Sequence, residues 1–212
     1  GEITIDLAVA EESIQQKALK YDKDGDRHYD VISAFIKSIR GSDPDAALYW
    51  LAVMIEAGES PRFIVRRLYV HAAEDIGLSD PQALLIVDAC ARACEYIGFP
   101  EARIPLAETV LYLATAPKSN TVITAIDQAL ELVRRSDGGP VPPHLRDAHH
   151  AGAEALGNGV EYQYPHQFPH AYVKQNYRPE NLARTKPVFY KPSPRGFEKQ
   201  LQARLDFWKK QP

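Results

Sequence analysis

The sequence predicts an all-α fold: a multi-helix antiparallel bundle, then an extended arm rich in proline and aromatic residues, then one final helix. Three features of the 212-residue chain support this prediction. Apolar residues recur at helical spacing between Asp30 and Arg135, Ser-Pro or Asp-Pro pairs open the apolar segments, and glycines close them. The connections are short, and short loops make neighbouring helices pack antiparallel.

Helix starts are marked by Asp43-Pro44, Ser60-Pro61 and Asp80-Pro81. The first residue of each pair can accept hydrogen bonds from the free amides of a first turn, and proline suits the first helical position because it has no amide hydrogen. Glycine readily adopts the left-handed conformation that ends a helix, so we expect stops at Gly41, Gly58, Gly77 and Gly98. These signals predict helices near residues 29–40, 44–57, 61–76, 81–97, 101–115 and 121–135.

The second of these helices is apolar on more than one side, because residues 46–54 form an almost unbroken apolar run. Such a helix must be covered around most of its circumference. Burial at the centre of the bundle and burial at a subunit interface both explain the run. We therefore take it as a core or oligomer helix, represented by Leu48, Trp50, Leu51 and Met54.

The chain changes character after Ser136, because 10 of its 16 prolines lie from Pro140 onward and residues 162–190 show no helical period. This segment predicts an extended arm whose aromatic side chains lie against the helical body. A final helix over 196–210 carries apolar residues three and four positions apart and should dock by one face.

Charge divides unevenly along the chain. Residues 172–212 contain ten Lys or Arg and three Asp or Glu, a balance of +7, so residues 1–171 carry −10 within the overall charge of −3. A basic arm can bind nucleic-acid phosphates, or it can satisfy acidic groups of its own body or of a neighbouring subunit, which we favour. The candidate DNA or partner surface consists of Lys174, Arg178, Arg184, Lys186, Lys191 and Arg195.

Composition and the ends of the chain indicate a cytoplasmic protein. No apolar run reaches the roughly 20 residues of a membrane span, and the first residues include no basic leader. The start at Gly1 suggests a piece of a longer protein, although processing or a cloning remnant would look the same. Cys90 and Cys94 share one helical face, where we expect core packing in a reducing compartment rather than a metal pair.

Motifs for nucleotide or calcium chemistry are incomplete. Residues 21–26 look like a calcium loop, but Gly25 is misplaced and no glutamate closes the loop. Residues 84–88 imitate a Walker B strand, but Ala89 follows instead of a glutamate, and the chain lacks the GxxxxGK[ST] loop that cradles phosphates. We expect no ATP hydrolysis by this chain and no cofactor in it.

Histidines raise the hypothesis of a small helical metalloenzyme. No helical zinc-ligand pattern accompanies them, so surface or packing roles are favoured. His71 is likewise not interpreted as a metal ligand. Together with Glu74 and Asp75 it is interpreted as one of a set of ionisable helix-end groups. The clustered histidines are His144, His149, His150, His166 and His170.

Two segments carry a resemblance to a known family: residues 21–30, YDKDGDRHYD, and residues 38–52, SIRGSDPDAALYWLA. Further matches are residues 56–59 (EAGE), residues 73–78 (AEDIGL) before Asp80-Pro81, and the YPH and FP elements within 164–169. Over nearly its whole length the chain resembles the C-terminal region of the RarA/MgsA recombination-factor family, AAA+ ATPases related to the Werner-helicase-interacting protein.

This resemblance implies a division into the tail of an AAA+ lid (1–20), a helical oligomerisation domain comparable in role to a clamp-loader collar (21–137), and an arm with a final helix packed on that body (138–212). It also implies a homotetramer. ATP and Mg would bind an ATPase core elsewhere in the parent protein, which would act at stalled replication forks with DNA and single-strand-binding protein. The family usually has paired glycines where this chain has His170-Ala171, which puts a tight turn there in doubt.

These features together predict a non-catalytic tetramerisation and scaffolding domain of a replication-associated ATPase, associated with the nucleoid. Apolar helix surface would be buried between copies, and linked copies would gain avidity for DNA. The alternative is a direct DNA-binding module, in which the basic arm binds phosphates and its aromatic residues stack on bases.

Overall fold

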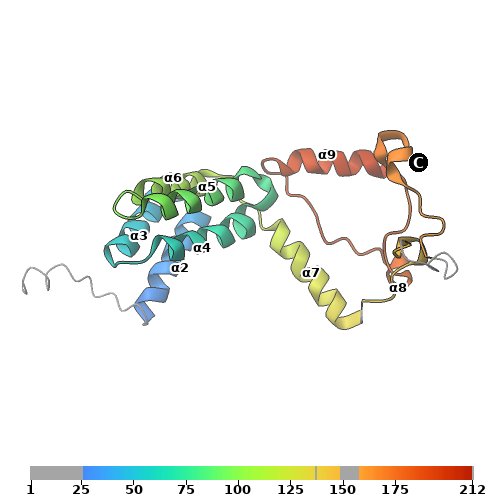
Figure 1. Cartoon of the computed structure of the whole chain (residues 1–212), viewed down its shortest axis with the longest axis horizontal. Coiled ribbons are helices and arrows are strands. Elements are labelled where there is room, and N and C mark those ends of the chain that lie inside the picture. Colours follow the sequence, from blue (N-terminus) through green and yellow to red (C-terminus); the bar gives the residue numbers. More distant parts are fainter. Residues whose placement is uncertain (1–25, 137, 149–157, 212) are drawn as a thin grey trace, which may run out of the picture. The chain divides into compact units, whose positions relative to one another are not determined.

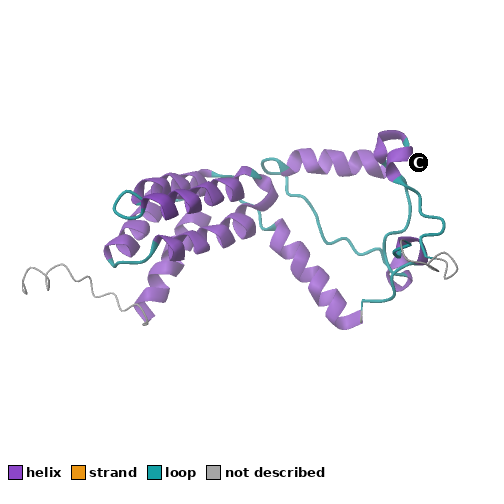
Figure 2. Cartoon of the chain, viewed as in Figure 1, coloured by secondary structure: helices purple, strands orange, loops and turns teal. Residues whose placement is uncertain are grey.

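The computed structural model describes residues 26–136, 138–148 and 158–211 (Figure 1). Within these ranges the secondary structure consists of helices and loops without a β-strand (Figure 2), so the all-α prediction is confirmed. The lid-tail segment 1–20, the calcium-like residues 21–25 and His149 and His150 lie outside the described residues. The likeness to a clamp-loader collar stays a prediction. By its internal contacts the chain divides into two compact units, Gly1–Asn120 and Thr121–Pro212.

The first unit is a bundle of helices joined by short loops, as predicted. After α4, a π-helical turn (Ala72–Ile76) replaces the last turn of the helix expected over 61–76, and a 3-10 turn (Gly77–Ser79) follows it. The other helix ends agree with the predicted ranges to within a few residues. The helices are α2 (Asp26–Arg40), α3 (Pro44–Glu56), α4 (Pro61–His71), α5 (Gln82–Ile97) and α6 (Arg103–Thr115).

The predicted helix starts are confirmed by their hydrogen bonds. The carboxylate of Asp43 accepts from the amide of Ala46 at 2.9 Å, and the hydroxyl of Ser60 accepts from the amide of Phe63 at 3.2 Å. Asp80 accepts from the amide of Gln82 at 3.1 Å. Each side chain thus satisfies an amide that has no partner within its helix.

Three of the four predicted glycine stops have a positive φ, which glycine tolerates best: Gly58, Gly77 and Gly98 have φ of 76°, 51° and 63°. At the end of α2 the left-handed residue is instead Ser42, with φ of 59°. The amide of Ser42 donates to the carbonyl of Ile39, and that of Asp43 to the carbonyl of Ser38, which is the hydrogen-bond pattern of a Schellman cap. The helix therefore ends where predicted, but one residue later takes the strained conformation.

The hydrophobic core of the described residues lies within the first unit, and every helix from α2 to α6 contributes to it. Helix α2, for example, buries Val31, Phe35 and Ile39, one side chain per turn of a single face. Cys90 and Cys94 are buried in this core as free thiols, with their sulfurs 3.9 Å apart, as expected. Burial raises the pKa of Cys94 to about 12, so its thiol stays protonated and unreactive.

The second unit is built from α7 (Thr121–Ser136), the short α8 (Glu180–Ala183) and α9 (Glu198–Lys209), joined by irregular chain with 3-10 turns. The predicted final helix is α9, and the predicted arm contains α8 as its one α-helix within the described residues. Helix α7 belongs to this unit by its contacts. No described side chain of α7 is buried, whereas the core helices before it bury many. The predicted division into domains at 1–20, 21–137 and 138–212 stays a prediction.

A buried carboxylate organises the second unit where α7 and α9 begin. Glu198 is fully buried, and one of its oxygens accepts hydrogen bonds from the amide and the hydroxyl of Ser193. Its other oxygen accepts from the hydroxyls of Thr121 and Tyr190. Burial together with the nearby negative charge of Glu198 raises the pKa of Tyr190 to about 12. One carboxylate thereby joins two helix starts and the intervening chain.

The tight turn doubted at residues 170–171 is present. His170 has φ of 60° and Ala171 has φ of 50°, both in the left-handed region that glycine occupies without steric cost. The ring of His170 packs edge-on against Phe207 of α9, with ring centroids 5.1 Å apart. The turn is therefore retained without glycines, at the expense of backbone strain.

Candidate functional site

The apolar helix predicted to be a core or oligomer helix is α3, which packs against α2 and α6. Leu51 and Met54 are buried in the core, and Leu48 and Trp50 are half-buried and pack against it. Tyr49 points away, with 62% of its surface exposed. Burial within one copy therefore explains why Leu51 and Met54 are apolar. Tyr49 lies on the exposed side of α3.

Large apolar side chains are nevertheless exposed on other helices of the first unit. On α5 they include Leu85, 62% exposed, and Tyr96, 90% exposed, and on α6 they include Ile104, 60% exposed. Leu84 and Ile97, next to Leu85 and Tyr96 in the sequence, are 46% and 50% exposed. Single exposed apolar residues are normal on a protein surface, whereas a contiguous apolar face marks an interaction site.

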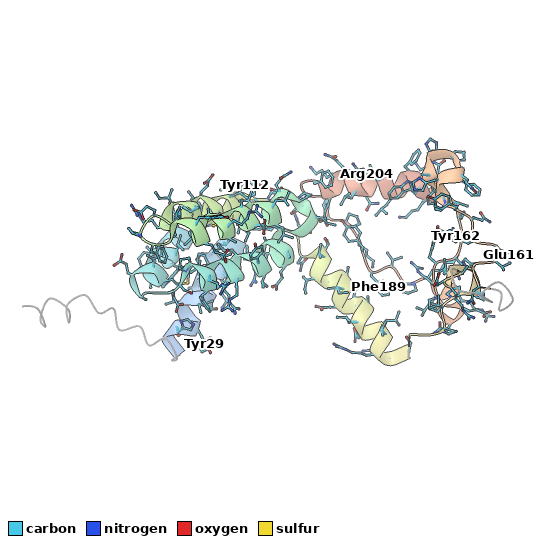
Figure 3. The ribbon with its side chains drawn as sticks, in the orientation of Figure 1. Tyr29, Tyr112, Glu161, Tyr162, Phe189 and Arg204 are labelled. Atoms are coloured by element: carbon cyan, nitrogen blue, oxygen red, sulfur yellow. The ribbon has the colours of Figure 1, made fainter. Side chains whose placement is uncertain are left out.

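Helix α7 has the clearest uncovered face. Ile126, Leu130 and Val133 are spaced by four and three residues, so they share one side of the helix, and they are 51%, 43% and 55% exposed. A neighbouring side of α7 faces the arm, because Leu132 of α7 lines the same hollow as Phe189 of the arm, which is labelled in Figure 3. The arm thus covers one stripe of α7 and leaves the other apolar stripe without cover in the described residues.

The basic candidates are only partly brought together. Lys174, Arg178 and Lys186 line one hollow of about 590 Å³ in the second unit, together with Tyr177, which is 52% exposed. The remaining candidates, Arg184, Lys191 and Arg195, do not line it. Three of the six predicted basic residues therefore share one hollow, and their role as a DNA or partner surface stays a prediction.

Hydrogen bonds hold the backbone of this basic hollow in place. The side-chain amide of Gln175 donates to the carbonyl of Gln163 at 2.7 Å, and its oxygen accepts from the amide of Gln163 at 3.3 Å. His144 donates from Nε2 to the carbonyl of Asn176 at 2.7 Å. The side chain of Asn176 bonds the backbone of Arg178 in both directions. The three cationic side chains thus belong to a segment whose backbone is held by several hydrogen bonds.

The charge in the hollow is uncompensated locally. Its lining contains no Asp or Glu, and within the part of the chain that the structure describes none of its three cations forms an ion pair. Cations without a protein partner, next to an exposed aromatic ring, suit a phosphodiester chain whose bases can stack.

An ionic cluster of Arg40, His71 and Asp75 lies at the turn after α4, where the sequence predicted a set of helix-end groups. Arg40 donates to the two oxygens of Asp75 at 2.7 and 3.1 Å, and Asp75 Oδ2 lies 2.9 Å from Nδ1 of His71. Neither ring nitrogen of His71 has a well-aligned hydrogen bond. Burial lowers the pKa of His71 to about 4, which the Asp75 carboxylate only partly opposes.

The same turn fastens the chain that follows α6. The carbonyl of Asp75 accepts from the amide of Ser119 at 2.7 Å, and the hydroxyl of Ser79 lies within hydrogen-bond distance of the Pro117 carbonyl. Tyr112 of α6 (Figure 3) donates to Asp80 at 2.6 Å. The residues that carried the family resemblance at 73–81 thus act here as a structural junction. Sequence patterns alone do not indicate it, because its partners are 30 or more positions away.

The histidine hypothesis receives no support from the described positions. Among the residues that the structure covers, no three His, Cys, Asp or Glu side chains are placed to hold a metal ion. His166 lies near the ring of Tyr164 at 5.1 Å, and His144 and His170 have the contacts given above. A metal at His149 or His150 stays untested. No described helix is long and apolar enough to cross a membrane.

Comparisons with known proteins agree with the predicted resemblance. The model of a family described as MgsA AAA+ ATPase C terminal matches residues 41–209, and that of the AAA C-terminal domain matches residues 1–40, which include α2. The chain is 52% identical, over 97% of its length, to replication-associated recombination protein A of Bacillus subtilis, covering 48% of that protein.

Two more distant relatives give the same result. Identity is 40% over 90% of the chain with replication-associated recombination protein A of Escherichia coli K12, and 41% over 84% of the chain with ATPase WRNIP1 of Dictyostelium discoideum. The chain covers 42% and 20% of these two proteins. The chain therefore spans less than half the length of each of these three relatives.

Proposed function

Because the chain belongs to the MgsA AAA+ ATPase C-terminal family, we propose that it is the helical oligomerisation and scaffolding region of a replication- and recombination-associated AAA+ ATPase. In this proposal it assembles as a homotetramer and sets the spacing of the ATPase heads, and ATP and Mg bind only to those heads. The whole protein acts on DNA at stalled replication forks, near single-strand-binding protein and the nucleoid.

The observation that carries the proposal is the uncovered apolar face of α7, formed by Ile126, Leu130 and Val133. Burying such a face between copies removes apolar surface from water, at about 25 cal/mol per Å². A second support is charge: α7 carries Asp127 and Glu131 before Arg134 and Arg135, so two antiparallel copies would bring opposite charges together. Holding several DNA-binding heads together raises avidity without new chemistry.

Sedimentation velocity at micromolar concentration tests this proposal. We expect the wild-type chain to sediment as a tetramer and Leu130→Glu to dissociate, because an unpaired carboxylate would be buried in the interface. Thr124→Glu is the matched control, since Thr124 is an exposed polar residue of the same helix outside the apolar face. A monomeric wild-type chain, or equal assembly of the two variants, contradicts the proposal.

A second function is favoured by the basic hollow: direct binding of single-stranded DNA by Lys174, Arg178 and Lys186, with Tyr177 stacking on a base. Its test is fluorescence anisotropy with a labelled single-stranded oligonucleotide at low salt. We expect binding to weaken strongly in a variant with these three cations changed to alanine.

The control for this test removes the same charge elsewhere, by changing Arg184, Lys191 and Arg195 to alanine. If only the first variant loses affinity, the hollow is the binding site. An equal loss in both variants would mean that binding depends on overall charge, and the proposed site would be wrong.

A further inference from the structure

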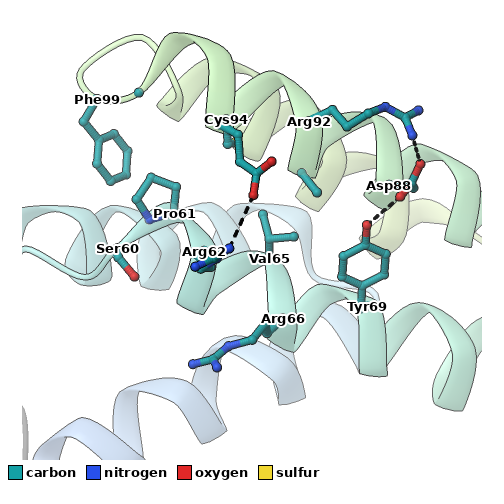
Figure 4. Close-up of a pocket in the computed structure, with 13 residues that line it drawn as sticks. Ser60, Pro61, Arg62, Val65, Arg66, Tyr69, Asp88, Arg92, Cys94 and Phe99 are labelled. Atoms are coloured by element: carbon teal, nitrogen blue, oxygen red, sulfur yellow. Dashed lines mark hydrogen bonds and ion pairs between the residues drawn. The ribbon is translucent and has the colours of Figure 1, made fainter.

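A groove of about 530 Å³ lies between α4 and α5, on the surface of the first unit (Figure 4). Its lining is mainly apolar and includes Pro61, Val65, Ala91, Cys94 and Phe99. Phe99 and Pro61 stand at one end of the groove, where the phenylalanine ring is 38% exposed. The groove therefore offers an uncovered apolar floor of a size that suits one or two side chains.

Arginines surround this apolar floor. Arg62 and Arg66 come from α4 and Arg92 from α5, against the two carboxylates Asp88 and Glu95. Arg62 lies 3.8 Å from Glu95, and both side chains are largely exposed, at 82% and 69%. An ion pair this long and exposed is weak, so Arg62 can exchange it for another carboxylate.

The other two arginines differ in whether they have an ion-pair partner. Arg92 is bonded to Asp88, which also accepts from the hydroxyl of Tyr69 at 2.8 Å. Arg66 forms no ion pair within the described ranges, and its guanidinium lies 5.8 Å from the centroid of the Phe63 ring. The rim thus has one more positive than negative charge. Arg66, in the middle of α4, is the arginine of the rim without an ion-pair partner in the described ranges.

We propose that this groove is a docking site for an acidic peptide segment of a partner protein, in which an apolar side chain enters the groove and flanking carboxylates bind the arginines. Guanidinium groups bind carboxylates by two parallel hydrogen bonds, and an apolar anchor in a concave site supplies affinity. The basic arm of another copy has the wrong charge for this rim. The site is separate from α7 and from the basic hollow.

The test uses fluorescence anisotropy with a fluorescein-labelled peptide that has one phenylalanine flanked by aspartates. We expect saturable binding that weakens with added salt. Replacing the aspartates by lysines, or the phenylalanine by glycine, should abolish it. Equal binding of the acidic and basic peptides, or no binding of the acidic peptide, overturns the proposal.

Two charge-reversal variants locate the binding. Arg66→Glu should weaken binding roughly tenfold or more, since it removes a charge-assisted contact and adds repulsion. Arg67→Glu should leave binding within about twofold. Arg67 is the matched control because it is exposed on the same helix, lies 5.5 Å from the same Phe63 ring, and does not line the groove. Equal losses in the two variants contradict the assignment.

A second pair of variants tests the apolar floor. Ala91→Trp should fill the groove and block the peptide, whereas Ala89→Trp, at an exposed position of α5 outside the lining, should not. Circular dichroism checks that both variants fold, and Arg66→Glu decides the matter if Ala91→Trp does not fold. If Arg66→Glu instead changes the sedimentation of the chain without affecting the peptide, the groove is covered by a second copy and the proposal is wrong.

Discussion

Burial keeps His71 neutral and links the stability of the first unit to pH. The side chain is fully buried beside the Arg40–Asp75 ion pair, and burial lowers its pKa from 6.5 to about 4. Between pH 4 and pH 6.5, His71 therefore binds a proton in the unfolded chain but not in the folded chain. This contribution to stability is complete above pH 6.5 and is lost as the pH falls toward 4.

We expect the free energy of unfolding to fall by up to about 3 kcal/mol over this window, since each pKa unit corresponds to about 1.4 kcal/mol. Urea unfolding followed by circular dichroism between pH 4.5 and 7.5 measures it. In His71→Gln the slope should be clearly smaller, because glutamine does not titrate. An unchanged slope in that variant would assign the pH dependence to other groups.

A glycine substitution usually lowers the stability of a protein, but in the strained turn at His170 and Ala171 we expect it to raise stability. Ala171 is exposed and has φ of 50°, so Ala171→Gly should raise the stability of the second unit by about 0.5–1 kcal/mol. Thermal unfolding measures this change. Ala203→Gly, in the exposed part of helix α9, should lower stability by about 1 kcal/mol. Destabilisation by both variants would show that the turn is unstrained.

At the scale of the helices, the buried Glu198 holds the starts of α7 and α9 together. Glu198→Leu would leave the hydroxyl of Ser193 and its amide without an acceptor in a buried position. We expect a loss of about 3 kcal/mol in the stability of the second unit. Urea unfolding followed by the fluorescence of Trp208 on α9, with Trp50 changed to phenylalanine in all variants, measures it. The exposed Glu180 supplies the control Glu180→Leu, which should change stability little.

The helices could be predicted because their signals are local. Asp43, Ser60 and Asp80 bond amides two or three residues ahead, so proline and capping patterns place the helix starts closely. The division of α3 into core and exposed sides depends on α2 and α6 packing against it, which periodicity does not specify. The basic hollow was missed as a cluster for a similar reason, since Gln163 and His144 position its backbone from a distance.

At the scale of the whole molecule, the two units differ in how much core they have. The buried hydrophobic residues in the described ranges all belong to the first unit, whereas Ser193 and Glu198 are the buried residues described in the second. A segment with so little apolar burial is marginally stable by itself. This is a further reason to expect that the second unit gains stability by association.

The two tryptophans allow this difference to be measured, because Trp50 lies in the first unit and Trp208 in the second. We expect Trp208 fluorescence in a Trp50→Phe variant to change at lower urea concentration than Trp50 fluorescence in a Trp208→Phe variant. The Trp208 transition should move to higher urea as protein concentration rises, since assembly stabilises the folded state. Coincident transitions independent of concentration would contradict both expectations.

Each unit fixes its own end of the chain at the boundary between them. The amide of Ser119 is bonded to the Asp75 carbonyl, and the hydroxyl of Thr121 is bonded to Glu198. Only Asn120 separates these two residues in the sequence. The backbone is therefore anchored within each unit almost up to the residue at which the other unit begins.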